Sequence, residues 1–131
     1  MSGYLFDTHA LIWWWNDNPL LPKTVRQALS NPQNAFFVSA ASAWEVATKV
    51  RLGKWPDAEE AAELFEALCD RNGFELLPVS VIHGLLAGSL PGDHRDPFDR
   101  MIAAQAIHDD LTVITRDPAL AALGCRAFWA E

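Results

Sequence analysis

Residues 111–117 read LTVITRD, a short β-type apolar run that ends in an acid. Residues 3–8 read GYLFDT and have the same design, an apolar strand followed by Asp7. In a parallel sheet the carboxyl ends of the strands lie at one edge, and ligands of open α/β sheets bind in the crevice outside that edge. The two stretches therefore predict that Asp7 and Asp117, from opposite ends of the chain, lie close together.

Outside these two stretches, strand and helix patterns alternate along the chain. Apolar β-type runs predict strands at 3–6, 35–38, 74–79, 111–115 and 125–129. Helical stripes, capping residues and turn formers predict helices at 8–15, 23–30, 40–52, 58–72, 81–90 and 118–123, and one more that begins at Asp96-Pro97. This alternation favours an α/β fold whose parallel sheet is covered by helices on both faces.

Composition limits the class of protein. The 131 residues, half of them hydrophobic, can bury one core, so we expect a single domain over residues 1–131. Cys69 and Cys125 stand alone, in no spacing typical of a zinc site or a disulfide scaffold. The absence of a leader pattern and of a membrane-spanning apolar run favours a cytoplasmic protein. The net charge of −7 argues against a broad basic face for nucleic acid, so RNA binding would need metal ions to offset it.

Two further segments bring acids to the same edge of the predicted sheet. Glu45 lies roughly one and a half turns beyond Ser39, which caps the helix that follows the second strand. The helix that begins at Asp96-Pro97 runs antiparallel to the strand after it, so Asp96 and Asp99 also start at this edge. Clustered carboxylates repel one another unless a cation is bound, and Mg²⁺ and Mn²⁺ prefer oxygen ligands. An all-acid pocket is typical of metal-assisted phosphodiester hydrolysis.

Most of these acids also have a structural interpretation. Asp7 and Asp117 can each cap the helix that follows them, and Asp96 is a natural N-cap with Asp99 as its capping partner. Glu45 could be a solvated or salt-bridged side chain, but a metal site is favoured, because Glu45 lies in an apolar turn of its helix, where an unpaired carboxylate would be costly.

Residues 5–10 (LFDTHA), 42–45 (SAWE), 94–106 (HRDPFDRMIAAQA) and 113–117 (VITRD) follow one another in an order that spans nearly the whole chain. Together these stretches resemble the PIN domain family and, within it, the VapC-type toxins of bacterial toxin–antitoxin pairs. The resemblance implies a three-layer α/β/α sandwich with a central parallel sheet. It also implies Mg²⁺- or Mn²⁺-dependent endoribonuclease activity, a homodimer, and a partner antitoxin that blocks the site.

The resemblance also assigns residues. By position, Asp7, Glu45, Asp99 and Asp117 match the family's catalytic and metal-binding acids, and Thr115 matches the hydroxyl residue of the last site strand. Asp99 is favoured over its alternative, Asp96, because Asp99 precedes residues 101–104 as the family acid does.

Neighbouring side chains are weaker candidates. Arg100 and Arg116 stand beside acids and would either hold RNA phosphates or form ion pairs with those acids. His94, in a loop rich in turn formers, is a candidate substrate contact. The tryptophans at 13–15 are expected to serve the core and an interface rather than a platform for stacked bases.

Two other functions compete with the ribonuclease. A Mg²⁺-dependent phosphoryl hydrolase would use Asp7 as a nucleophile, but such a site wants a second acid two residues later, where this chain has His9. A non-catalytic interaction module would instead use the acidic rim to bind a basic protein segment.

Overall fold

Five parallel strands form the central sheet of the computed structural model, which describes residues 3–129. The strand order is β3-β2-β1-β4-β5, and all four neighbouring pairs are parallel. The strands are β1 (Gly3–Phe6), β2 (Ala35–Ser39), β3 (Glu75–Leu77), β4 (Thr112–Ile114) and β5 (Arg126–Phe128). The two strands that end next to Asp7 and Thr115, β1 and β4, are therefore neighbours at the centre of the sheet.

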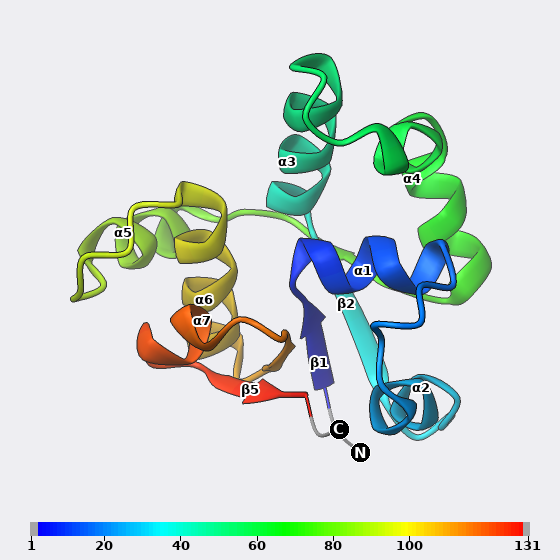
Figure 1. Cartoon of the computed structure of the whole chain (residues 1–131). Coiled ribbons are helices and arrows are strands. Elements are labelled where there is room, and N and C mark those ends of the chain that lie inside the picture. The colour runs from blue at the N-terminus through cyan, green and yellow to red at the C-terminus, as the bar shows by residue number, and fades with distance from the viewer. Residues whose placement is uncertain (1–2, 130–131) are drawn as a thin grey trace.

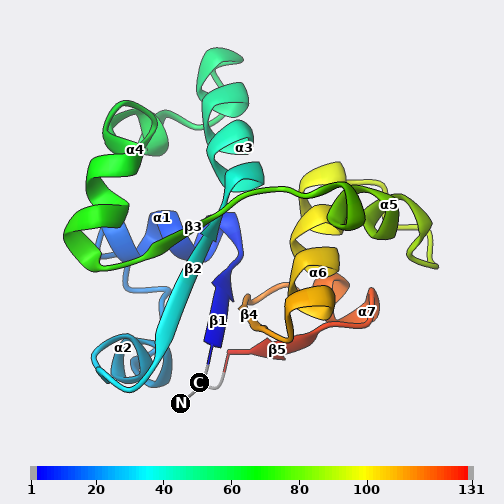
Figure 2. The ribbon, with the colours of Figure 1, turned by 180° about the vertical axis from the view of Figure 1, so that it is seen from behind.

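Helices connect the strands and cover both faces of the sheet (Figures 1 and 2). They are α1 (Thr8–Trp15), α2 (Lys23–Leu29), α3 (Ala40–Arg51), α4 (Glu59–Asn72), α5 (Val81–Ser89), α6 (Pro97–Asp109) and α7 (Pro118–Ala122), with a short 3₁₀ helix, η1 (Pro56–Ala58), before α4. Helices α1, α2 and α4 lie on one side of the strands, and α5, α6 and α7 lie on the other. The chain has the expected three-layer α/β/α architecture.

Each face of the sheet has its own core, because successive side chains of a strand point to opposite faces. In β1, Phe6 packs into the core beneath α1, α2 and α4, whereas Leu5 packs into the core beneath α5, α6 and α7. In β4, Ile114 packs into the same core as Phe6, and Val113 packs into the same core as Leu5. All four side chains are fully buried. Burial on both faces explains why these strands are almost continuously apolar in sequence.

Local sequence sets where the helices near the carboxyl edge begin. The Ser39 hydroxyl accepts a hydrogen bond of 2.9 Å from the backbone N–H of Ala41, which caps α3 as predicted. Helix α3 then extends beyond the carboxyl edge of the strands (Figure 1). A buried hydrogen bond of 2.9 Å joins the hydroxyls of Thr8 and Ser42, and so ties the first turn of α1 to the first turn of α3.

The structure differs from the sequence prediction on the β3 side of the sheet. The helix predicted at 58–72 is kinked at Leu64 (φ −111°, ψ 19°) and is preceded by η1. The strand predicted at 74–79 covers only Glu75–Leu77, because Pro78 has no N–H to donate to a ladder. Neither difference moves the edge at which β1 and β4 end.

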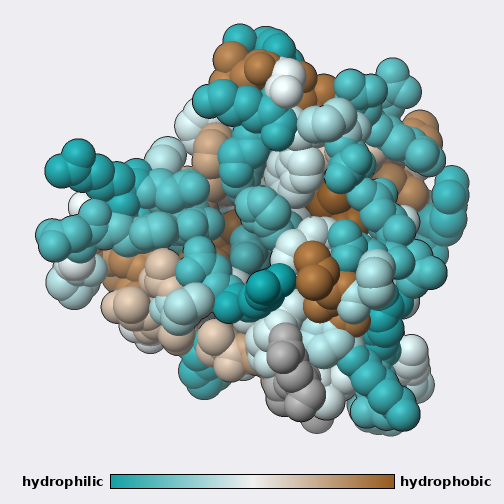
Figure 3. Space-filling view, in the orientation of Figure 1, coloured by the Kyte–Doolittle hydropathy of each residue, from teal (hydrophilic) through white to brown (hydrophobic). Residues whose placement is uncertain are grey.

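The surface is largely polar but carries exposed apolar side chains. The face in Figure 3 is mostly hydrophilic, with hydrophobic side chains in separate patches. Val81 and Leu85 on α5 are 78% and 71% exposed, and Trp44 on α3 is 62% exposed. Within residues 3–129, none of the helices has both the length and the apolar character needed to cross a bilayer.

Candidate metal and catalytic site

Asp7 lies directly after β1 and is held by the neighbouring strand. Its backbone N–H donates to the carbonyl of Ile114 (3.0 Å), and its side-chain Oδ2 accepts a hydrogen bond of 2.8 Å from the Thr115 hydroxyl. The Thr115 oxygen in turn accepts the backbone N–H of Asp117 (3.0 Å). The Asp7 carboxylate makes no capping hydrogen bond at the start of α1. Asp7 is the N-cap residue of α1, but its carboxylate is oriented mainly by the hydrogen bond from Thr115.

Glu45 lies on α3 and is 2% exposed. Its Oε2 forms an ion pair with Lys49, one helical turn further along. Its Oε1 is buried and has no hydrogen-bond partner within residues 3–129. A buried carboxylate oxygen without a partner is costly unless another ligand satisfies it.

The first turn of α6 brings in two acids with different roles. Asp96 caps the helix, because its Oδ1 accepts the backbone N–H groups of Phe98 (2.9 Å) and Asp99 (3.2 Å). Asp99 does not take part in the cap through its side chain; instead, its Oδ2 lies 2.8 Å from Nε2 of His94. His94 therefore contacts an acid of the candidate site.

Asp117 combines both interpretations that the sequence allowed. Its Oδ1 caps α7 by accepting the backbone N–H of Ala119 (2.9 Å). The residue is exposed and faces the same pocket as Asp7. Oδ1 of Asp117 is thus used to cap α7, and the other carboxylate oxygen has no hydrogen-bond partner within residues 3–129.

These acids line one pocket of about 520 Å³ outside the carboxyl ends of β1 and β4. Its lining residues are Asp7, His9, Ala10, Trp13, Glu45, His94, Asp96, Asp99, Arg116, Asp117 and Pro118. The structure thus brings together all four acids singled out from the sequence, together with Asp96. Thr115 lies beneath the pocket as the hydrogen-bond donor to Asp7.

Burial and mutual repulsion make this pocket unfavourable for negative charge. The pKa of Asp7 is raised from 3.8 to about 7, mainly by burial and also by the charges of Asp99 and Glu45, against the hydrogen bond from Thr115 that lowers it. Burial also raises the pKa of Asp99, and the negative charges of Asp96 and Glu45 add to this increase. Burial lowers the pKa of His9, so this ring contributes little positive charge to offset the acids. The pocket is therefore electrostatically suited to a bound cation.

Arg100 does not have the role considered from its position in the sequence. Its guanidinium donates to the backbone carbonyls of Ala87 (2.9 Å), His94 (3.0 Å) and Leu90. It lines a separate apolar pocket between α3, α5 and α6. Arg100 neither pairs with the acids nor faces them, because carbonyls at the end of α5 and in the following loop occupy its donors.

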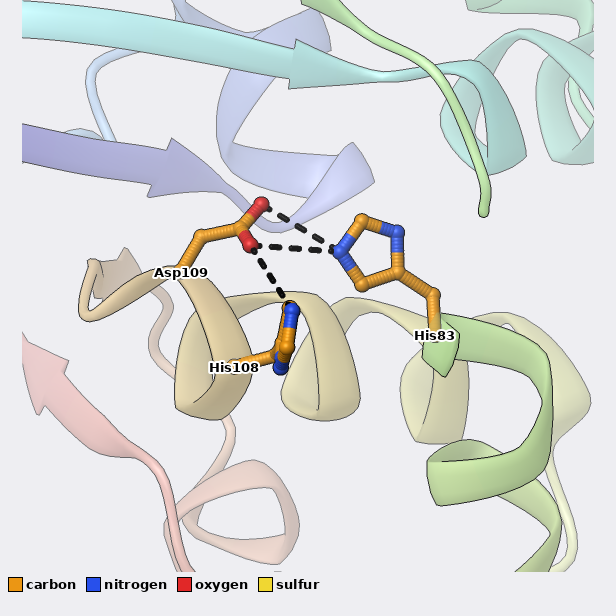
Figure 4. A group of neighbouring side chains, drawn as sticks. All are labelled: His83, His108 and Asp109. Atoms are coloured by element: carbon orange, nitrogen blue, oxygen red, sulfur yellow. Dashed lines mark hydrogen bonds and ion pairs between the residues drawn. The ribbon is translucent and has the colours of Figure 1, made fainter. Parts of the chain in front are cut away.

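A second titratable cluster lies at the other end of α6 (Figure 4). It is the one group of three His, Cys or acidic side chains within residues 3–129 whose ligand atoms all lie within 4.8 Å of one another: His83, His108 and Asp109. The backbone N–H of Ser80 donates to Nδ1 of His83 (3.1 Å), so the ring proton is on Nε2. That Nε2 donates to Asp109, whose two oxygens lie 3.2 and 3.3 Å away. Both ring nitrogens of His83 are therefore used, and the cluster joins α5 to α6.

The sequence analysis did not identify the side chains that contact Glu45 and Asp99. Lys49 follows Glu45 at the i,i+4 spacing of helical ion pairs, which is a readable signal. The pairing of His94 with Asp99 depends on the path of a loop and has no comparable signal.

Comparison with known proteins identifies the family of this chain. The family model described as PIN domain matches residues 4–124. The chain belongs to the PIN domain family. Curated proteins, searched by sequence, contain no match.

Solved structures share this PIN fold at low sequence identity. VapBC2 from Rickettsia felis bound to a DNA fragment from its promoter matches with a TM-score of 0.70 and 17% identity, covering 97% of this chain and 98% of that one. FitAcB from Neisseria gonorrhoeae matches with a TM-score of 0.70 and 23% identity, covering 95% and 96%. VapBC-1 from nontypeable Haemophilus influenzae matches with a TM-score of 0.69 and 18% identity, covering 99% and 100%. At these identities the matches establish the fold.

Proposed function

We propose that this PIN domain is a metal-dependent endoribonuclease in which Asp7, Glu45, Asp99 and Asp117 hold one or two Mg²⁺ or Mn²⁺ ions. The observation that carries the proposal is the gathering of these acids, from four separate segments, around one pocket. Membership of the PIN domain family supports a nuclease, since family members are generally nucleases that depend on divalent metal.

The donor set fits a hard divalent cation. All four side chains offer carboxylate oxygens, which Mg²⁺ and Mn²⁺ prefer. The unpartnered, buried Oε1 of Glu45 and the raised pKa of Asp7 are both relieved by a cation in the pocket. No three of these acids bring their oxygens within 4.8 Å of one another in the described part of the chain. This spacing suits Mg²⁺, which usually keeps several waters in its shell.

The side chains divide the work of the proposed reaction. A bound Mg²⁺ or Mn²⁺ supplies an activated water and stabilises charge on the phosphate that is cut. Thr115 keeps Asp7 in one orientation, so the carboxylate is positioned before the ion binds. Glu45 contributes from the buried side of the pocket, and Asp117 from its exposed side. Asp96 is assigned to capping α6, a role that orients the turn carrying Asp99.

We further propose that the chain is the toxin of a toxin–antitoxin pair, acts on RNA in the cytoplasm, forms a homodimer and is blocked by a cognate antitoxin. Its structural neighbours include VapBC and FitAB complexes and a toxin–antitoxin complex from Klebsiella pneumoniae. The exposed apolar side chains of Trp44, Val81 and Leu85 support a protein partner.

The test is RNA cleavage by protein stripped with a chelator and then supplied with Mg²⁺ or Mn²⁺. We expect cleavage to return with metal in the wild type and to stay absent in Asp7→Asn and Asp117→Asn. Asp57→Asn, which removes an exposed acid outside the pocket, is the matched control and should cut RNA normally.

Three results would contradict the proposal. Full activity of both Asp7→Asn and Asp117→Asn would show that the acids are not the site. Absence of metal-dependent cleavage of every RNA, with partner binding retained by Asp99→Asn, would favour the interaction module instead. A covalent phosphoryl adduct on Asp7 would favour the phosphoryl hydrolase.

A further inference from the structure

The basic side chains in or near the acid pocket differ in how fully their donors are used, and Arg100, which the sequence also suggested, lies in a neighbouring pocket. Lys49 forms an ion pair with Glu45, and His94 contacts Asp99. Arg100 donates to three backbone carbonyls. Arg116 differs from them, because within residues 3–129 it makes neither a hydrogen bond nor an ion pair, although it lines the same pocket as five carboxylates.

Arg116 is held instead by an aromatic ring. Its guanidinium carbon lies 6.0 Å from the centre of the Trp13 ring, in a cation–π contact. Arg116 is exposed at the rim, between Thr115 beneath the pocket and Asp117 on its wall. The contact with Trp13 uses none of the N–H donors of the guanidinium in a hydrogen bond, so these donors are available to a ligand.

Trp13 is itself fixed in place. It is partly buried in the core on its side of the sheet and packs against Trp129, with ring centres 5.8 Å apart. It also lines the acid pocket, whereas its neighbours Trp14 and Trp15 pack against the core without lining it. Of the three consecutive tryptophans, Trp13 alone is thus placed to position a group at the pocket.

We propose that Arg116, positioned by Trp13, binds a phosphate of the RNA next to the one that is cut. This proposal rests on the ribonuclease function above. A phosphate that approaches this pocket is repelled by five carboxylates. The guanidinium of Arg116 on the rim supplies attraction, because its planar fork can donate to two phosphate oxygens at once. The phosphate is a flanking one because Arg116 lies on the exposed rim, whereas Glu45 and Asp7, which define the interior of the pocket, are buried.

The test compares Arg116→Gln, Arg116→Lys and Trp13→Leu with wild type in steady-state RNA cleavage at several salt concentrations. Arg126→Gln is the matched control, because it removes the same charge from an exposed residue that pairs with Asp110 at the opposite end of α6 from Asp99. We expect Arg116→Gln to raise KM about tenfold with kcat changed less than about twofold. The slope of log(kcat/KM) against log[salt] should fall by about 1.

Trp13 is a positioning residue and should give a smaller effect. Trp13→Leu keeps the Arg116 charge but removes the contact that holds it, so KM should rise about threefold. Arg116→Lys keeps the charge but loses the planar fork, and we expect an intermediate KM. Arg126→Gln should leave KM and kcat unchanged. If Trp13→Leu does not fold, the two Arg116 variants still decide the question.

Two outcomes would overturn the proposal while leaving the ribonuclease function intact. One is wild-type KM and salt slope in Arg116→Gln. The other is a loss of kcat with unchanged KM, which would place Arg116 at the phosphate that is cut. If the wild type cuts no RNA, the ribonuclease function fails, and anisotropy of a labelled RNA with Mg²⁺ still tests Arg116. Equal binding by wild type and Arg116→Gln would then overturn the proposal.

Discussion

The two titratable clusters at the ends of α6 differ in how their polar atoms are satisfied. At the Asp109 end, His83 uses both ring nitrogens in hydrogen bonds, to Ser80 and to Asp109. At the Asp99 end, a buried oxygen of Glu45 has no partner within residues 3–129, and the pKa of Asp7 is raised to about 7. The His83 cluster is the more tightly gathered of the two, yet the acid pocket is the one that needs a ligand. Closeness of ligand atoms is therefore a poorer guide to a metal site than unsatisfied charge.

The largest expected effect is the loss of cleavage when a pocket acid is neutralised. Asp99→Asn should reduce RNA cleavage with Mg²⁺ by about a thousandfold or more, because the pocket loses a metal ligand. The thermal midpoint of the metal-free variant should equal or exceed that of the wild type, since repulsion at the pocket is relieved. Cleavage rates and circular dichroism melts measure the two effects. If Asp99→Asn cuts RNA at the wild-type rate, the acid pocket is no more important for cleavage than the His83 cluster.

A smaller effect is expected from the residue that orients Asp7. Thr115→Val removes the hydrogen bond to Asp7 and the acceptor for the Asp117 N–H, while keeping the shape of the side chain. We expect cleavage to fall about 10- to 100-fold, as is common when a metal ligand loses its orienting partner. Thr115→Ser, which keeps the hydroxyl, should recover most of the activity. Equal losses in both variants would indicate a packing role.

The His83 cluster should affect stability and not catalysis. His83→Leu removes the bonds to Ser80 and Asp109, and we expect a loss of about 1–2 kcal/mol in the free energy of unfolding. RNA cleavage should stay at the wild-type rate. Urea unfolding gives the first quantity and the Mg²⁺ cleavage assay gives the second.

Zinc binding tests whether the cluster of His83, His108 and Asp109 is a metal site. Because the hydrogen bonds of His83 leave no nitrogen lone pair directed at a metal, Zn²⁺ should not raise the thermal midpoint of wild-type protein through this cluster. If Zn²⁺ raises the thermal midpoint of the wild type but not that of His83→Leu, the cluster is a metal site. The contrast between this cluster and the acid pocket would then be wrong.

The last expected effect is the pH dependence of the stability of the metal-free protein, which leaves cleavage with Mg²⁺ out of the measurement. Because the pKa of Asp7 is raised from 3.8 to about 7 by folding, the folded chain binds more protons than the unfolded chain between these values. Stability should therefore fall as pH rises from about 4 to about 7, by roughly ten degrees in thermal midpoint. Asp7→Asn should flatten this trend, whereas Asp57→Asn should keep it. A midpoint that rises steadily over the same range would contradict the environment assigned to Asp7.

Much of the fold and of the candidate site was readable before the structure. The strands at 3–6 and 111–115 were predictable because both faces of the sheet are buried, which makes their sequences almost continuously apolar. Their acids were placed at one edge by the direction of parallel strands alone. The kink at Leu64 and the short β3 were not predicted, because they depend on packing at an outer edge of the sheet.

Periodicity, caps and strand ends act over a few residues, so the linear chain was enough to specify the α/β class and the candidate acids Asp7, Glu45, Asp99 and Asp117. Apart from Lys49, which follows Glu45 at a helical spacing, the partners of the side chains at the site were decided only by folding. Thr115 reaches Asp7 across 108 positions, Arg100 donates to backbone carbonyls, and Arg116 contacts the ring of Trp13. Such choices depend on rotamers and on contacts between distant segments, which no local pattern encodes.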